Sequence, residues 1–168
     1  VGRREIDDFQ PHFIHASGLH FQSSLAAAVL SRRQKLPLVT TAHIGSVERL
    51  AAPIRAATTS YERTIGRFIL GSSARVIAVS EAVAEHLVSL GTRPELVHVV
   101  PNGVDLERFR PRERQTGLHR ELGLPPDTPL IGSIGQIGMR KGVDTLVGAS
   151  EKIIDQAPGV HFVYVGER

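Results

Sequence analysis

Short Val/Ile-rich runs alternate with longer amphipathic segments along this 168-residue chain, and that order restricts its fold more than any other feature. Strands that alternate with helices build parallel βαβ units. Most of the runs are continuously apolar, which predicts strands covered on both faces of a sheet. The sequence therefore predicts the α/β class with parallel sheets. The expected strands span residues 12–17, 36–43, 75–80, 96–101, 129–135 and 160–166.

Helices are expected between these strands, at residues 20–34, 53–72, 80–91, 114–122 and 141–158. In the segment 80–91, Ser80 can cap the first turn, and Gly91 can take the left-handed conformation that ends a helix. One apolar face of this helix is predicted to be made by Val83, Leu87 and Leu90. In the last helix, the residues predicted on one side are Leu146, Ile153 and Ile154, with Pro158 as the terminator.

The composition is that of a folded globular chain. Hydrophobic residues make up 41% and charged residues 22%, so disorder of the whole chain is not expected. The formal net charge is +3 without a long Lys/Arg block, so no nucleic-acid partner is predicted. Cysteine is absent, which excludes disulfides and thiolate metal sites. The apolar runs are too short to span a membrane.

A proline-rich stretch from 102 to 129 interrupts the strand and helix rhythm. Such a stretch between two α/β patterns is typical of a linker between domains. The predicted organisation is a first domain at 1–110, a linker at 111–128 and the start of a second domain at 129–168. Because the chain begins with Val1 and stops directly after a strand-like run, it is interpreted as a fragment.

The stretch "PLIGSIGQIGMRKGVDTL", residues 129–146, carries the clearest candidate site. A strand ends at Gly135, and a helix begins near Lys141 after a short glycine-rich turn. Unpaired N–H groups at a helix N-terminus favour anions, and Arg140 with Lys141 would add full charges. The spacing matches neither G-x-x-x-x-G-K-[ST] nor G-x-G-x-x-G. Two interpretations stay open: a phosphate-binding turn, or an ordinary turn with two solvated bases, which the spacing alone favours.

His43 ends the strand in "LVTTAHIG", at the carboxyl edge where α/β sheets bind ligands. A single histidine at such a position serves structure about as often as function. The turn in "VVPNGVDLERFRP" is interpreted as structural, because Asn-Gly tolerates positive φ.

Five segments in one order resemble the retaining GT-B glycosyltransferases of family 4, also called group 1. "FQPHFIHAS" is similar to the family's Pro-Asp-hydrophobic-hydrophobic-His strand, "PLVTTAH" to its Thr-x-His strand end, and "ARVIAVSEAVAEHL" to its Val-Ser-Glu segment. "VHVVPNGVDLERFRP" resembles Pro-Asn-Gly-Val-Asp-x-x-x-Phe-x-Pro, and "IGQIGMRKGVDTLVGA" resembles Gly-Arg-x-x-x-x-Lys-Gly-x-x-x-Leu. Together they extend over nearly the whole chain.

The resemblance implies two Rossmann-like domains that face each other across a cleft, both incomplete in this chain. The first would bind the acceptor and the second the nucleotide-sugar donor. The implied reaction transfers a sugar from a nucleoside diphosphate to a hydroxyl of a glycan, lipid or small molecule, with retention at the anomeric carbon. No metal or other cofactor is expected, and the sequence has no Asp-x-Asp cluster. The implied location is the cytoplasm, with peripheral association at the inner membrane face as a further option.

Family roles carry over to a few positions. Lys141 would pair with the donor diphosphate next to Gly135, and His43 would lie near the donor sugar. Gln136 stands where the family has an arginine, so Arg140 is the candidate to supply the second charge. The alternative is a non-catalytic α/β module that binds a nucleotide or a protein through the same helix N-terminus.

Overall fold

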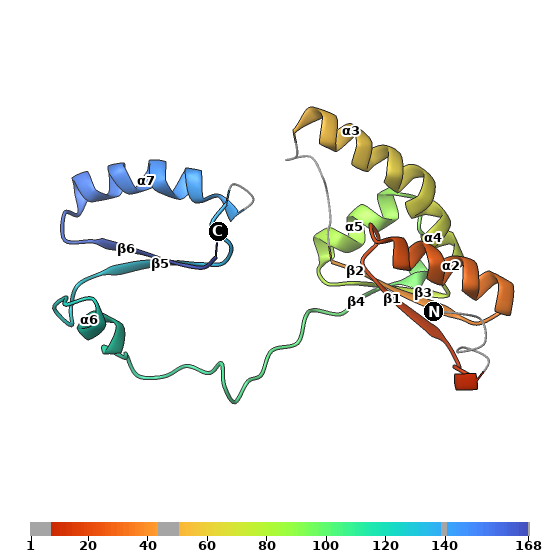
Figure 1. Ribbon diagram of the computed structural model, residues 1–168, viewed down its shortest axis with the longest axis horizontal. Coiled ribbons are helices and arrows are strands. Elements are labelled where there is room, and N and C mark those ends of the chain that lie inside the picture. The colour runs from red at the N-terminus through yellow and green to blue at the C-terminus, as the bar shows by residue number, and fades with distance from the viewer. Residues whose placement is uncertain (1–7, 44–50, 139–140, 168) are drawn as a thin grey trace. The chain divides into compact units, whose positions relative to one another are not determined.

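The computed structural model describes residues 8–43, 51–138 and 141–167. The chain divides into two compact units, Val1–Asp105 and Leu106–Arg168, called unit 1 and unit 2 below (Figure 1). The domain and linker limits inferred from the sequence rest on composition and stay predictions.

Unit 1 is built on a parallel sheet with strand order β1-β2-β3-β4. Each strand lies inside a run expected from the sequence, so the predicted α/β class with a parallel sheet is confirmed. The strands are β1 Ile14–Ser17, β2 Leu38–Ala42, β3 Arg75–Ala78 and β4 Val97–Val99.

The connections of unit 1 are helical. The segment expected as one helix at 53–72 is continuous but has a π-helical turn, η1, in its middle. Pro53 lies in its first turn, as expected. The helical elements are α2 Gln22–Gln34, α3 Ala52–Tyr61, η1 Glu62–Gly66, α4 Arg67–Ser72, α5 Glu81–Ser89 and the 3-10 turn η2 Pro94–Leu96.

Helix α5 begins and ends as its sequence predicts. The Ser80 hydroxyl accepts a hydrogen bond from the backbone N–H of Val83 at 3.4 Å, and Gly91 has a φ of 95°. The predicted apolar face is buried: Val83 is 6% exposed, Leu87 0% and Leu90 8%. These are the local signals that a single sequence carries best.

The expectation that the strands are covered on both faces is wrong for β3, whereas in β2 residues of both faces, Thr40 and Thr41, are buried. Val76 and Ala78 of β3 are fully buried, whereas Arg75 is exposed and Ile77 half-buried. Consecutive parallel strands joined by right-handed crossovers in one direction place every helix on the same face, as Figure 1 shows for α2, α4 and α5. The apolar strand sequences therefore did not indicate how many faces this chain covers.

Unit 2 contains the parallel pair β5 and β6, joined through α7 (Figure 1). Among the described residues, every buried hydrophobic side chain lies in unit 1, and His119 is the buried residue of unit 2. Ile154 was expected with the apolar side of α7 but is 44% exposed, because the half-buried positions run through Leu146 and Ile153 at helical spacing. The elements are α6 Gly117–Glu121, β5 Leu130–Ile134, α7 Val143–Gln156 and β6 His161–Val165.

Candidate functional site

The predicted site residues are divided between the two units. Gly135, Gln136 and Lys141 belong to unit 2, and His43 belongs to unit 1. Arg140 lies outside the described residues.

The turn after β5 is held by backbone pairing with the end of β6. The Gly135 N–H donates to the carbonyl of Val165 at 2.9 Å, and the Ile137 N–H donates to that of Glu167 at 2.8 Å. Gly135 has a φ of 141°, a conformation that favours glycine. A side chain on Gly166 would collide with the Gly135 carbonyl oxygen. Glycine at both positions therefore lets the two strand ends approach closely.

The Lys141 side chain lies over Gly135. A Cβ atom added to Gly135 would be 3.9 Å from Cε of Lys141, so the two residues that the sequence predicted to act together are neighbours. The backbone N–H of Lys141 donates to the Gly138 carbonyl at 3.0 Å. The side chain is exposed, which leaves its ammonium group accessible to a ligand at this turn.

Helix α7 begins directly after Lys141. Gly142 is its N-cap with a φ of 68°, and no side chain among the described residues caps it. The first intrahelical bond runs from the Leu146 N–H to the Gly142 carbonyl at 2.9 Å. The N–H groups of the first turn thus lack side-chain acceptors, which suits an anion. Asp144 lies in that turn. Its carboxylate stabilises the N-terminal end of the helix but would repel a phosphate bound close to it.

Gln136 follows Gly135 and is exposed. Its amide can donate or accept hydrogen bonds but carries no charge. Within the described part of the turn, Lys141 is therefore the basic side chain.

His43 lies just beyond the carboxyl end of β2 and is exposed. Its Nε2 is 3.0 Å from the hydroxyl of Ser17, at the end of the neighbouring strand β1. Ser17 pairs in register with Thr41, so the parallel pairing brings it beside the residues that follow β2. Ser17 was not predicted from the sequence, although its place at a strand end is the signal that could have indicated it.

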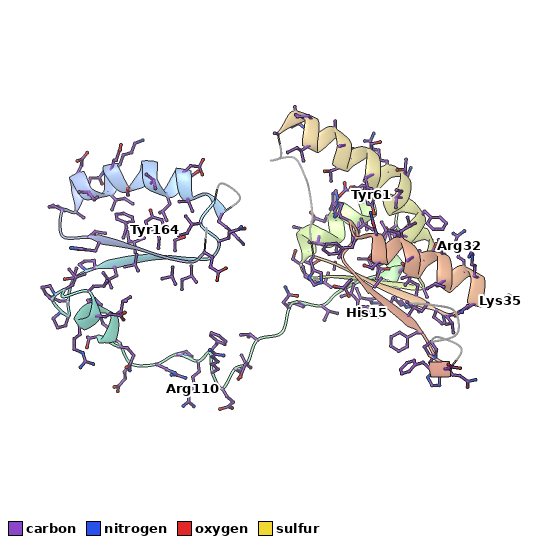
Figure 2. The ribbon with its side chains drawn as sticks, in the orientation of Figure 1. His15, Arg32, Lys35, Tyr61, Arg110 and Tyr164 are labelled. Carbon is purple, nitrogen blue, oxygen red and sulfur yellow. The ribbon has the colours of Figure 1, made fainter. Side chains whose placement is uncertain are left out.

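The neighbouring His15 is hydrogen-bonded to the adjacent strand of the sheet. Its Nε2 is 2.8 Å from the Thr41 hydroxyl across the β1–β2 pair. Figure 2 labels His15. The sequence assigned it no role.

A buried polar cluster in unit 1 was missed by sequence reasoning. Glu62 is 1% exposed, and its Oε1 lies 3.0 Å from Nε2 of His20 and 3.3 Å from Nε2 of His86. The sequence spacing could have indicated this position. Glu62 precedes the buried residues Gly66, Ile69 and Leu70 at helical intervals. It therefore lies on the face of the helix that packs against the core, although it is acidic.

The described residues contain neither a membrane-spanning helix nor a cluster suited to a metal ion. None of their helices is long and apolar enough to cross a bilayer. Nor do they contain a group of three or more His, Cys, Asp or Glu side chains that could hold a metal ion.

Solved structures support the fold. The chain resembles Anabaena HepE in complex with UDP and glucose, with a TM-score of 0.70 and 21% identity over 98% of this chain and 42% of that one. HepE in complex with UDP-glucose has a TM-score of 0.68 and 23% identity, over 93% of this chain and 40% of that one. At this identity the likeness shows the fold alone, and it confirms the GT-B class predicted from the sequence.

Sequence comparisons identify the family. D-inositol 3-phosphate glycosyltransferase of Nocardia farcinica is 35% identical over 83% of this chain and 32% of its own length. The enzyme of the same name from Segniliparus rotundus is 32% identical over 83% and 31%. The chain thus spans about a third of the length of these curated relatives. The family model described as Glycosyltransferase Family 4 matches residues 2–108, more than half of the chain. The chain belongs to glycosyltransferase family 4.

Proposed function

We propose that this chain is part of an enzyme that transfers a sugar from a nucleoside diphosphate sugar to a hydroxyl group, with retention of anomeric configuration. Family membership and the names of the relatives support the transfer reaction. Similar solved chains hold UDP-glucose or UDP and glucose, which supports a nucleotide-sugar donor. The observation that carries the proposal is the position of Lys141 over Gly135 at the uncapped start of α7.

In the proposed reaction, Lys141 pairs with the donor diphosphate. Negative charge builds on the diphosphate as its bond to the sugar breaks. A positioned ammonium and the first N–H groups of α7 stabilise that charge. Because these interactions are stronger in the transition state than in the donor complex, they lower the activation barrier of the transfer as well as the dissociation constant of the donor.

The second charge of the diphosphate clamp is proposed to come from Arg140, because Gln136 is uncharged. Gln136 keeps a hydrogen-bonding role through its amide. In unit 1, His43 is proposed to contact the donor sugar, with its ring orientation set by the Ser17 hydroxyl.

The proposed acceptor is a hydroxyl of a glycan, a lipid or a small molecule. Transfer is proposed to need no metal or other cofactor, which rests on the family resemblance and the lack of an Asp-x-Asp cluster in the sequence. The proposed location is the cytoplasm, with peripheral association at the inner membrane face if the acceptor is a lipid.

The test is an assay of the intact protein with UDP-, GDP- and ADP-sugars and a panel of hydroxyl acceptors. Acceptor-dependent release of nucleoside diphosphate, with a product of unchanged anomeric configuration by NMR, is the expected result. Donor binding without release would instead favour the non-catalytic module. An inverted product would overturn retention, and loss of release in EDTA, restored by Mg²⁺ or Mn²⁺, would overturn metal independence.

A further inference from the structure

The buried cluster of unit 1 joins three separate elements. Glu62 comes from η1, His86 from α5 and His20 from the loop between β1 and α2. Tyr61, at the end of α3, stacks beside His20 with ring centroids 5.8 Å apart (Figure 2 labels Tyr61). The Tyr61 hydroxyl donates to the Leu19 carbonyl at 3.4 Å. The buried Glu62 carboxylate requires its two histidine partners, because removing a charge from water costs free energy unless the charge is paired.

The loop that carries His20 is held in place at the carboxyl edge of the sheet. The Gly18 N–H donates to the Thr41 carbonyl at 2.8 Å, and the Ser24 hydroxyl donates to the Gly18 carbonyl at 2.6 Å. Parallel α/β sheets bind their ligands at this edge. His20 therefore lies on a fixed loop, where a ligand contact requires little ordering on binding.

The contacts of Glu62 define which ring nitrogen of His20 is available. A carboxylate oxygen accepts hydrogen bonds, so Nε2 of His20 carries the proton that it donates to Glu62. In the neutral ring, Nδ1 is then an acceptor. Among the described residues, this Nδ1 has no hydrogen-bond partner and is not one of the buried unpartnered atoms. The side chain of His20 is 26% exposed, against 13% for His86.

We propose that His20 binds a hydroxyl group of the acceptor through Nδ1, and that Glu62 is the positioning residue that holds the ring in the required tautomer. This inference rests on the proposed function. The ligand class follows from charge, because the Glu62 carboxylate 3.0 Å from the ring disfavours a second anion. A neutral hydroxyl can donate to Nδ1 without that repulsion.

Two substitutions separate ligand binding from structural support. The asparagine of His20→Asn retains a polar atom at the δ position but loses the bond to Glu62. The glutamine of His20→Gln retains an N–H at the ε position but offers no δ acceptor. We expect His20→Gln to keep the wild-type Tm and to raise the acceptor KM about tenfold, the effect of losing one hydrogen bond. His20→Asn should lower Tm while its acceptor KM stays within about threefold of wild type.

Glu62 and His86 supply the positioning test and the control. Glu62→Gln keeps an acceptor oxygen for both rings and should retain the acceptor KM, whereas Glu62→Met should raise it. His86→Gln changes the other ring that is bonded to Glu62, and it should leave the acceptor KM unchanged. In the control variant His86→Gln, the donor KM and the release of nucleoside diphosphate without acceptor should also stay as in wild type. An acceptor KM that follows Tm through the series would overturn the inference, because it would show a structural role only.

A measurement independent of activity tests the tautomer. Long-range ¹H–¹⁵N NMR of the histidine rings in this chain should show Nε2 protonated and Nδ1 unprotonated for neutral His20. A proton on Nδ1 in the neutral ring would overturn the inference whatever the assay gives. Failure of wild type to release nucleoside diphosphate from any donor would overturn the proposed function, and the NMR result would still decide the role of Nδ1.

Discussion

Lys141 and Gly135 show how single residues build the turn after β5. The positive φ of Gly135 and its bond to Val165 let the strand end close, and the Lys141 side chain lies beside this glycine. A lysine is a compact charge on a flexible stem, so a neighbouring backbone is needed to hold it near one ligand position.

Replacement of Lys141 by alanine should weaken donor binding. Loss of one charged hydrogen bond costs about 1.5–3 kcal/mol, or roughly 10- to 100-fold in the dissociation constant. Titration calorimetry of the intact protein with its sugar nucleotide measures this. Lys152→Ala, on helix α7 and also exposed, is the matched control and should bind donor as wild type does. Unchanged donor affinity in the Lys141 variant would rule out its assigned role.

Replacement of Gly166 by alanine should open the strand ends of unit 2. The added methyl group would meet the Gly135 carbonyl, and overpacking of this kind costs about 1–3 kcal/mol. Hydrogen exchange at the Gly135 amide should become about tenfold faster or more. Gly148→Ala on α7 is the control, since nothing lies within 4 Å of the added atom, and it should leave this exchange rate unchanged. Equal exchange in both variants would contradict the close approach.

At the scale of elements, the helices differ in what holds them. Helix α5 has its own cap and a buried apolar face. Helix α3 has no buried residue, and the chain returns to the core through η1, where Glu62 binds two histidines. A π turn changes which side chains face inward by adding one residue to a turn, and such turns are frequent at functional sites.

Replacement of Ser80 by alanine should destabilise unit 1 through its cap. The Val83 N–H would lose the hydroxyl that it donates to, at a cost of about 1 kcal/mol. Tm should fall by roughly 4–8 °C in a unit of this size. Ser89→Ala, at the other end of α5, removes an exposed hydroxyl that bonds only to the helix carbonyl of His86. That control should stay within about 0.5 kcal/mol of wild type, and an equal loss in both variants would argue against capping.

At the scale of the whole chain, the two units differ in how much they bury. The core of unit 1 includes Leu38, Ile69, Val76 and Leu87, all fully buried. In the described part of unit 2 no hydrophobic side chain is buried to that degree. Burial of apolar area is the main favourable term in folding, so the stability of this chain resides mainly in unit 1.

Residues 112–168 made as a separate peptide should not unfold cooperatively. A two-stranded parallel pair with helices α6 and α7 buries too little apolar surface to offset its chain entropy. Circular dichroism on heating should show a gradual loss of signal, whereas residues 1–105 should give a sigmoidal transition. A sharp, calorimetrically two-state melt of 112–168 would show that this segment folds by itself.

Local chemistry explains which elements were predictable. The six strands lie within the expected runs, and Ser80 and Gly91 act on α5 as expected, because propensity and capping depend on near neighbours in the chain. The Lys141 turn was located in the same way. Its phosphate role came from family resemblance, because the spacing alone favoured an ordinary turn.

The amino-acid sequence by itself determined the order of strands and helices, the caps of α5 and the glycine turn before α7, since each depends on residues close together in the chain. Only the tertiary structure decided that one face of the unit 1 sheet is covered and that Ser17 meets His43. It also brought His20 and His86 to Glu62, across 42 and 24 residues of chain. Such contacts depend on strand register, crossover direction and the π turn, which arise only when distant segments pack together.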